Sequence, residues 1–297
     1  NSLTIKDVTL AADILWRIYK ETERKDGYVS IEVPPKYAYD IDQTINEAQK
    51  LFMRIGRENI MIKVPATKEG AVAIERLISK GINVNATLIF SSSHYENVAR
   101  AYIEGLEEFS REGGDLKRVA SVASLFVSRI DTLVDREISS LIELGKNLEK
   151  KRDLEGLLGK AAIANSQKVY QKFKQIFSQE NFKDLERRGA RVQRPLWAST
   201  STKEPAYSDV KYVEELIGPD TVNTIPQVTL DAFRDHGKPR LSLEENLDVV
   251  ERVLSRIERA GINLDEVCET LQREGVDAFE KSFENLLGTL RQKMKKE

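Results

Sequence analysis

Hydrophobic residues follow two alternating patterns along the chain, short continuous runs and longer stretches with a helical period. The short runs, rich in valine and isoleucine, predict six buried strands, at residues 27–33, 59–65, 82–90, 119–128, 190–200 and 221–226. Between them, apolar residues recur every three or four positions and predict helices, at 44–56, 68–81, 95–109, 130–144, 155–177 and 206–218. A helical pattern through Leu10, Ile14 and Ile18 precedes the first strand, a charged connector covers 145–156, and three helices are expected after the last strand.

Strands that alternate with helices predict a parallel sheet, because parallel neighbours need long crossover connections. Two architectures fit this order, a doubly wound sheet and a (β/α)8 barrel. Five polar residues lie inside the apolar strands, towards their carboxyl ends: Glu32, Lys63, Asn85, Thr87 and Ser124. A doubly wound sheet would bury most of them without partners, whereas a barrel collects them at its mouth. We therefore expect a (β/α)8 TIM barrel with residues 1–297 as a single domain, and helices from about 236 to 297 packed on the barrel.

The composition narrows the class of protein further. The 297 residues carry a net charge of −2, which argues against nucleic acid or an anionic membrane as a partner. Cys268 is the single cysteine, so no disulfide or cysteine-based zinc site forms within the chain, and with only His94 and His236 a multi-histidine metal site is not expected. No apolar run approaches the ~18 residues of a membrane span. A cytoplasmic protein is the expectation.

Lys63 lies within residues 59–67, "NIMIKVPAT", which otherwise read as a buried strand. A structural interpretation pairs it with Glu32 in a salt bridge inside the barrel. A buried ion pair contributes little to stability, however, because taking two charges out of water is costly. The functional interpretation, in which the amine is a nucleophile that forms a Schiff base, is therefore favoured.

Asn85 and Thr87 lie two positions apart in one strand, so their side chains point to the same face. Together with a nearby lysine they predict an array of hydrogen bonds for substrate hydroxyls or a bound water. A single buried asparagine can also be an ordinary polar residue of a core. Ser124 fits either a substrate contact or a small residue tolerated for packing.

Arg129 comes just after the fourth predicted strand, at the start of a helix. A cation is unfavourable there unless an anion binds as well, since the helix dipole is positive at that end. Phosphate binding is one explanation, and an ion pair with Asp131 or Asp135 is the other.

A run of hydroxyl residues, "STST", ends the fifth predicted strand. Ser199 at its start and Lys203 just after it are candidate phosphate ligands, although such runs are usually plain loops. Neither a GxGxxG nor a GxxxxGK[ST] fingerprint occurs, so no cofactor is expected.

The chain resembles the transaldolases over nearly its whole length. "IMIKVPATKEGAVAIERLISKGINVNATLIFS" is similar to their Schiff-base-lysine signature, and "SVASLFVSRIDTLVD" and "RPLWASTSTKEPAYSDVKYVEELIGPDTVNTIP" are similar to the longer bacterial subfamily. The resemblance implies a transferase of the pentose phosphate pathway with sugar phosphates as substrates and no metal. It would move a dihydroxyacetone unit from sedoheptulose 7-phosphate or fructose 6-phosphate to an aldose phosphate.

The resemblance also implies a role for each matching residue. Lys63 would form the Schiff base, while Glu32 and Thr87 would orient a catalytic water. The implied substrate contacts are Asn85, Ser124 and Arg129, the last through a phosphate group.

The sequence departs from the family pattern in two places. Transaldolases have two earlier strands, one with an aspartate base and one with a "TSNPT"-like segment, and neither is found here. A second phosphate arginine of some relatives is also unmatched, where this chain reads "WASTST" and Lys203 is the candidate substitute. We therefore expect a barrel that lacks its first two strands in this chain, whose open edges favour a homo-oligomer.

Three alternatives remain open at this point. A fructose-6-phosphate aldolase-like lyase would share the barrel and Lys63. A phosphate-binding barrel isomerase would use Lys63 only as a charge. A catalytically impaired barrel would serve as a binding or assembly module.

The last predicted helix carries an apolar stripe at helical spacing. Its members are Phe279, Phe283, Leu286 and Leu290. The stripe is expected either to cover the barrel mouth or to be ordinary core.

Overall fold

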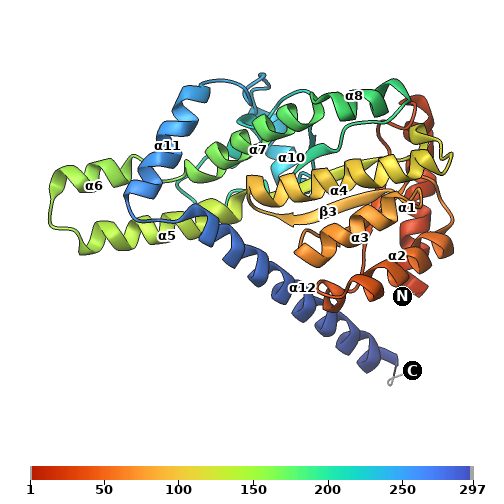
Figure 1. Ribbon diagram of the computed structural model, residues 1–297. Coiled ribbons are helices and arrows are strands. Elements are labelled where there is room, and N and C mark those ends of the chain that lie inside the picture. Colours follow the sequence, from red (N-terminus) through yellow and green to blue (C-terminus); the bar gives the residue numbers. More distant parts are fainter. Residues whose placement is uncertain (1, 295–297) are drawn as a thin grey trace.

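The computed structural model of the protein describes residues 2–294. Six parallel strands form one sheet in sequence order, with the bounds Val29–Glu32 (β1), Ile60–Pro65 (β2), Val84–Ile89 (β3), Ser121–Phe126 (β4), Arg194–Ala198 (β5) and Val222–Asn223 (β6). The six predicted strands and their parallel arrangement are therefore confirmed. The sheet curls, and the helices between its strands cover its outer face, as in part of a barrel of the TIM type (Figure 1).

Helices connect the strands and follow the last one. Their bounds are Ser2–Glu21 (α1), Ile41–Ile55 (α2), Lys68–Ile78 (α3), Ser92–Arg111 (α4), Ser128–Leu144 (α5), Leu148–Glu155 (α6), Ala161–Phe177 (α7), Glu180–Arg187 (α8), Lys211–Glu214 (α9), Gln227–His236 (α10), Leu247–Arg259 (α11) and Leu264–Met294 (α12). Two short 3-10 helices are Pro35–Tyr37 (η1) and Leu116–Arg118 (η2).

The two faces of the sheet carry different side chains, because successive residues of a strand point to opposite faces. Ile60, Ile62 and Val64 of β2 face the large core that the surrounding helices complete. Met61 faces a small cluster on the concave side of the sheet, where its buried partners are Ala120, Val122 and Leu196. Lys63, two residues after Met61, therefore also projects from the concave face.

Side-chain caps fix where the first crossover helices begin. Asp40 accepts a hydrogen bond from the backbone N–H of Gln43, and Thr67 and Ser91 cap α3 and α4 in the same way. Such caps satisfy backbone donors that the first turn of a helix leaves unpaired. Each helix therefore starts close to the carboxyl end of a strand and returns along the outside of the sheet.

Three segments differ from the sequence-based expectation, the first being residues 180–187, where the helix α8 was not predicted. The expected connector 145–156 contains the helix α6, which Asn147 caps by accepting hydrogen bonds from two backbone N–H groups. No residue of α6 is buried, so it has no apolar stripe for periodicity to reveal. The expected helix 206–218 is reduced to the four residues of α9, because hydrogen-bonded turns at Tyr207 and Lys211 occupy its first half.

The helix expected at the start of the chain is present as α1, but it packs with a different face from its apolar stripe. Ala12 and Tyr19 are buried, whereas Leu10, Ile14 and Ile18 are exposed, with Ile14 at 77%. An apolar stripe of α1 is thus uncovered within the described residues.

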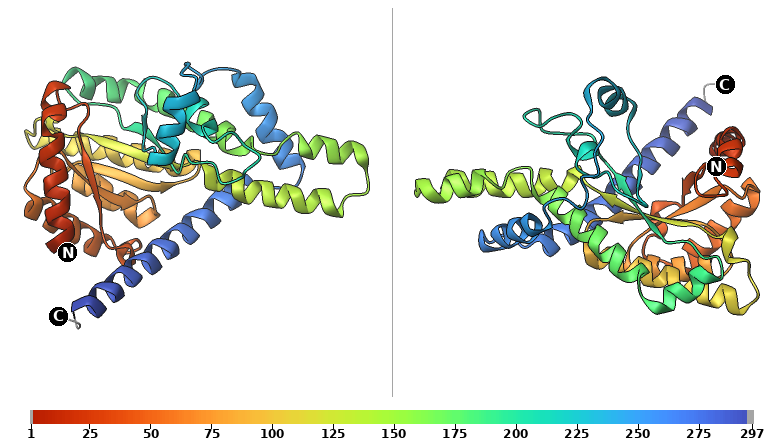
Figure 2. Two further views of the ribbon diagram at one scale, coloured as in Figure 1. Left: turned by 180° about the vertical axis from the view of Figure 1, so that it is seen from behind. Right: turned by 90° about the horizontal axis from the view of Figure 1, so that it is seen from above.

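Two of the C-terminal helices pack on different parts of the protein. α11 packs on α7, and α12 contacts α5, β3 and η1, so that it runs past the carboxyl ends of the strands (Figure 2). The pair α5 and α6 projects from the body of the protein (Figures 1 and 2). Among the described residues, no helix combines the length and apolar character that crossing a membrane requires.

Candidate active site

Lys63 and Glu32 lie side by side at the carboxyl ends of β1 and β2. The two residues are register partners in neighbouring strands, and Lys63 Nζ is 3.6 Å from Glu32 Oε2. Their side chains are 25% and 23% exposed, so both reach solvent only in part. The salt bridge of the structural interpretation is therefore present, and it lies on the concave face.

The environment of Glu32 favours its neutral form. Burial raises the pKa of the Glu32 carboxyl above its usual value, and the charge of Lys63 opposes only part of that shift. Glu32 Oε1 is buried without a hydrogen-bond partner in the described structure. A carboxyl in these surroundings is suited to exchanging a proton with a bound molecule.

Asn85 holds together three strands on the concave face. Its Nδ2 donates to Ser30 Oγ on β1 at 3.1 Å, and its Oδ1 accepts from Ser124 Oγ on β4 at 2.7 Å. The structure thus brings Asn85 and Ser124 together beside Lys63, which is the register partner of Asn85. One amide hydrogen and one carbonyl lone pair of Asn85 stay available for another molecule.

Thr87 is fully buried and lies two residues after Asn85 in β3. Its Oγ1 has no hydrogen-bond partner in the described structure. Buried hydroxyls are normally paired, so an unpaired one indicates a site for a bound water or ligand. Thr87 and Glu32 both offer such an atom near the mouth of the sheet.

Arg129 lies in the first turn of α5. Within residues 2–294 it forms no ion pair, and its guanidinium stacks 5.3 Å from the ring centre of Phe126. Asp131 and Asp135 pair elsewhere, Asp131 with Lys211 and Asp135 with Tyr207. The expected alternative, an ion pair of Arg129 with either aspartate, is therefore wrong.

The start of α5 has further donors without partners. No side chain caps the helix, and Ser128 Oγ is buried and unpaired in the described structure. The backbone N–H of Ser128 donates to the carbonyl of Ser199 at 3.1 Å, which places Ser199 beside Arg129. An unpaired arginine and a helix N-terminus together form a favourable place for an anion.

Lys203 is not brought into this group. It is exposed in the loop after β5 and makes no hydrogen bond or ion pair within the described part of the chain. Because Lys203 lies in a loop and not in a strand, no periodic pattern of the sequence predicts where its side chain points.

Two functional candidates come from outside the strand motifs. Phe279 of α12 lies with its ring centre 6.0 Å from Lys63 Nζ and 6.3 Å from that of Phe126. Phe279 thus lies over the mouth, whereas Leu286 of the same stripe is 52% exposed and the side chain of Leu290 lies outside those described. Ser30 also joins the site, and only its position two residues before Glu32 could have signalled it.

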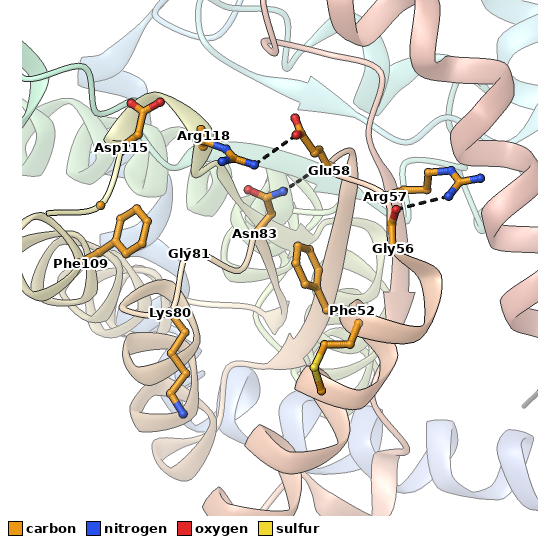
Figure 3. A pocket seen from close by; sticks show the side chains of 12 residues that line it. Phe52, Gly56, Arg57, Glu58, Lys80, Gly81, Asn83, Phe109, Asp115 and Arg118 are labelled. Atoms are coloured by element: carbon orange, nitrogen blue, oxygen red, sulfur yellow. Dashed lines mark hydrogen bonds and ion pairs between the residues drawn. The ribbon is translucent and has the colours of Figure 1, made fainter. Parts of the chain in front are cut away.

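A separate cavity of about 550 Å³ opens at the opposite end of the sheet (Figure 3). Phe52 and Phe109 line it, and Glu58 pairs there with Arg118 at 3.1 Å. Asn83 donates to the backbone carbonyl of Glu58 at 2.8 Å. Because the amino ends of barrel strands are concerned with stability rather than catalysis, we place the candidate site at the mouth with Lys63.

No metal centre is found in the described part of the chain. Residues 2–294 contain no group of three or more histidine, cysteine, aspartate or glutamate side chains that could hold a metal ion. The arrangement at the mouth instead offers an amine, a carboxyl, hydroxyls and a guanidinium.

Fold and site together define a class of protein, the α/β barrel-type proteins whose polar site lies at the carboxyl ends of parallel strands. The sequence profile of the family described as Transaldolase/Fructose-6-phosphate aldolase matches residues 1–290. This chain therefore belongs to the transaldolase/fructose-6-phosphate aldolase family.

Individual relatives agree with the family match. A protein named Transaldolase from Trichodesmium erythraeum is 49% identical over 297 residues, which cover 99% of this chain and 78% of that protein. Transaldolase 2 from Nostoc punctiforme is 46% identical over 297 residues, with 99% and 78% covered. Transaldolase from Saccharopolyspora erythraea is 45% identical over 293 residues, with 98% and 77% covered.

Proposed function

We propose that this protein is a transaldolase, a transferase that works through an imine on Lys63. The observation that carries the proposal is the position of Lys63 Nζ on the concave face, 3.6 Å from the Glu32 carboxyl, whose pKa burial raises. Relatives named Transaldolase, at 43–49% identity over nearly the whole chain, support the activity.

The first step forms the imine. The amine of Lys63 adds to the carbonyl carbon of a ketose phosphate, and the carbinolamine then loses its hydroxyl as water to give an iminium ion. Glu32 and Thr87 would hold the water that carries protons in this step, since each has a buried oxygen without a partner. Asn85 and Ser124 would bond the sugar hydroxyls beside it.

The second step breaks the bond between C3 and C4. Removal of the proton from the C4 hydroxyl releases an aldehyde, and the electron pair of the broken bond enters the iminium to form an enamine. The enamine then adds to the carbonyl carbon of an acceptor aldose phosphate, and water hydrolyses the new iminium. The resemblance assigns the C4 base to an aspartate on a strand that the sequence of 297 residues does not contain.

The substrate phosphate would bind at the start of α5. Arg129 has no carboxylate partner within the described residues, and the unpaired hydroxyl of Ser128 and the helix N-terminus lie next to it. Ser199 would line the same place, and Lys203, exposed in the loop after β5, is a further candidate for the phosphate.

The finer features of the fold belong to the same proposal. We infer an eight-stranded barrel in which two further strands close the gap between β1 and β6. In support of this, β1 and β6 each pair with a single strand among the described residues. One core cluster extends from Ala12 to Val276, which supports a single domain. A cytoplasmic location is consistent with the one buried free thiol, Cys268.

The experiment is borohydride trapping in the full-length protein with fructose 6-phosphate. Only an imine is reduced to a stable adduct, so peptide mapping should find the sugar-derived mass on Lys63 and Lys63→Met should abolish it. Lys211 is an internal control, because its side chain is 18% exposed, like that of a buried lysine, but is paired with Asp131 at 3.3 Å. An adduct on Lys211 or none at all would contradict the proposal.

The second activity in the family name is fructose-6-phosphate aldolase, a lyase. Product analysis separates it from the transferase. Fructose 6-phosphate with erythrose 4-phosphate should give sedoheptulose 7-phosphate, whereas release of free dihydroxyacetone without an acceptor would indicate the lyase.

A further inference from the structure

Gln272 of α12 joins the ends of the two strands that carry Lys63 and Thr87. Its Nε2 donates to the carbonyl of Ala66 and to the carbonyl of Leu88, each at 3.0 Å. The side chain is 8% exposed, although it belongs to a helix more than 180 residues away from both strands. One amide thus connects α12 to the carboxyl ends of β2 and β3.

Leu88 has an unusual backbone conformation at this contact. Its φ is +58°, in the left-handed region that residues other than glycine rarely adopt. The register of β3 against β4 shifts between Ala86 and Ile89, around this residue. A conformation of this kind costs about 1–3 kcal/mol and persists only where its surroundings hold it.

Two residues of α12, Gln272 and Gly275, lie against Leu88. Gly275 lies one helical turn after Gln272, and a Cβ atom there would come within 2.9 Å of Leu88 Cδ2. Gln272 therefore binds the carbonyl of Leu88 while Gly275 leaves room for its side chain. The neighbouring residue His94 completes the contact, with its Nδ1 3.3 Å from Gln272 Nε2 and its Nε2 2.9 Å from Glu269 Oε1 on α12.

Thr87 lies between the two points that Gln272 holds. Its carbonyl accepts a hydrogen bond from the backbone N–H of Ala66 at 2.7 Å, and Leu88 is the next residue in the chain. Gln272 thus binds Ala66, the residue that follows the end of β2, and Leu88, the residue that follows Thr87. The direction of the unpaired Thr87 hydroxyl depends on this backbone.

We propose that Gln272 is a positioning residue, which sets the backbone of β3 so that the hydroxyl of Thr87 faces Glu32 and Lys63. The proposal rests on the proposed function, because Thr87 acts there on the water of imine formation. Gln272 itself touches neither substrate nor the reacting atoms.

The test is a double-mutant cycle in the full-length protein, with Gln272→Met, Thr87→Val and both together. Gln272→Met should lower kcat about 5- to 100-fold, the range expected for coupled neighbours, with little change in KM. In the Thr87→Val background the same substitution should have almost no further effect. Additive losses in the cycle would overturn the proposal.

Gln167 provides a matched control. It is also 8% exposed, and its Nε2 donates to the backbone carbonyls of Leu243 and Glu245 at 3.3 and 3.2 Å, away from the mouth. Gln167→Met should lower the melting temperature as Gln272→Met does but leave kcat unchanged. An equal fall in kcat for both variants would assign Gln272 a merely structural role.

A second variant keeps the test valid if Gln272→Met folds poorly. Gly275→Ala should displace the Leu88 side chain while leaving the Gln272 amide in place. It should reduce kcat in the wild-type protein but cause almost no further loss in the Thr87→Val variant. Borohydride trapping on the wild-type protein separates the two hypotheses. No adduct on Lys63 would overturn the proposed function and this inference together, whereas an adduct with an additive cycle would overturn this inference alone.

Discussion

At the scale of single residues, two opposing effects set the pKa of Glu32. Burial favours its neutral form, while the charge of Lys63 at 3.6 Å favours its ionised form. Burial is the larger effect, so the pKa of Glu32 is raised in the folded protein. A raised pKa means that folding favours protonated Glu32, and this contribution to stability is present at low pH and lost as the pH rises through the folded-state pKa.

The Glu32→Gln variant tests this balance, because glutamine resembles the protonated acid. The variant should unfold at a higher urea concentration than the wild-type protein at pH 8, and at about the same concentration at pH 4. Its transferase activity should fall about 10²- to 10⁴-fold, the usual contribution of a proton-transfer group. Urea unfolding curves at the two pH values provide the measurement, and a constant difference between the proteins at both pH values would contradict the assignment.

At the scale of elements, the start of α5 combines three features that favour an anion. The helix has no side-chain cap, Ser128 has an unpaired hydroxyl in the described structure, and Arg129 has no carboxylate partner there. Asp131 and Asp135 follow on the same helix, but Asp131 forms an ion pair with Lys211 and Asp135 accepts a hydrogen bond from Tyr207. The positive charge at this helix start is therefore left for a bound group.

Arg129→Met should weaken binding of phosphorylated substrates specifically. We expect KM for fructose 6-phosphate to rise about 10- to 100-fold, the equivalent of one or two hydrogen bonds to a charged group. KM for unphosphorylated fructose should stay the same. Arg136→Met is the control, since Arg136 is exposed two turns further along α5. Equal changes with both sugars would show that Arg129 does not bind phosphate.

At the scale of the whole molecule, the sheet of the described residues is open. β1 and β6 each pair with one strand only, and the apolar stripe of α1 is exposed near the β1 edge. Open edges and apolar faces are where other chains add. The polypeptide of residues 1–297, studied by itself, is therefore expected to self-associate.

Sedimentation equilibrium at micromolar concentration tests this expectation. The average mass should exceed the 33.7 kDa of one chain, and Ile14→Lys should lower it by placing a charge on the exposed stripe. Ala12→Lys is not a suitable control because Ala12 is buried, so Lys6→Gln serves instead. A stable monomer with a single cooperative melting transition would contradict the expectation.

The local pattern predicted the strands well and some helices poorly. The apolar runs stand out most in β2, β3 and β4, which are buried along almost their whole length, whereas β1 and β6 at the sheet edges are only partly buried. α6 has no buried residue and so leaves no clear periodic signal, whereas the periodic signal over 206–218 predicted a longer helix than the four residues of α9. The stripe of Leu10, Ile14 and Ile18 predicted α1 but not the face with which it packs.

The sequence by itself determined the alternation of strands and helices and the shared face of Asn85 and Thr87, whereas the strand register of the structure placed Glu32 and Lys63 on the same face. A period of two residues fixes this face once the strand is recognised. Only the tertiary structure decided that Ser30 reaches Asn85, that Phe279 lies over Lys63, and that Gln272 holds the ends of two strands. These contacts join segments far apart in the chain, and a local pattern reports which residues are buried but not which distant residues bury them.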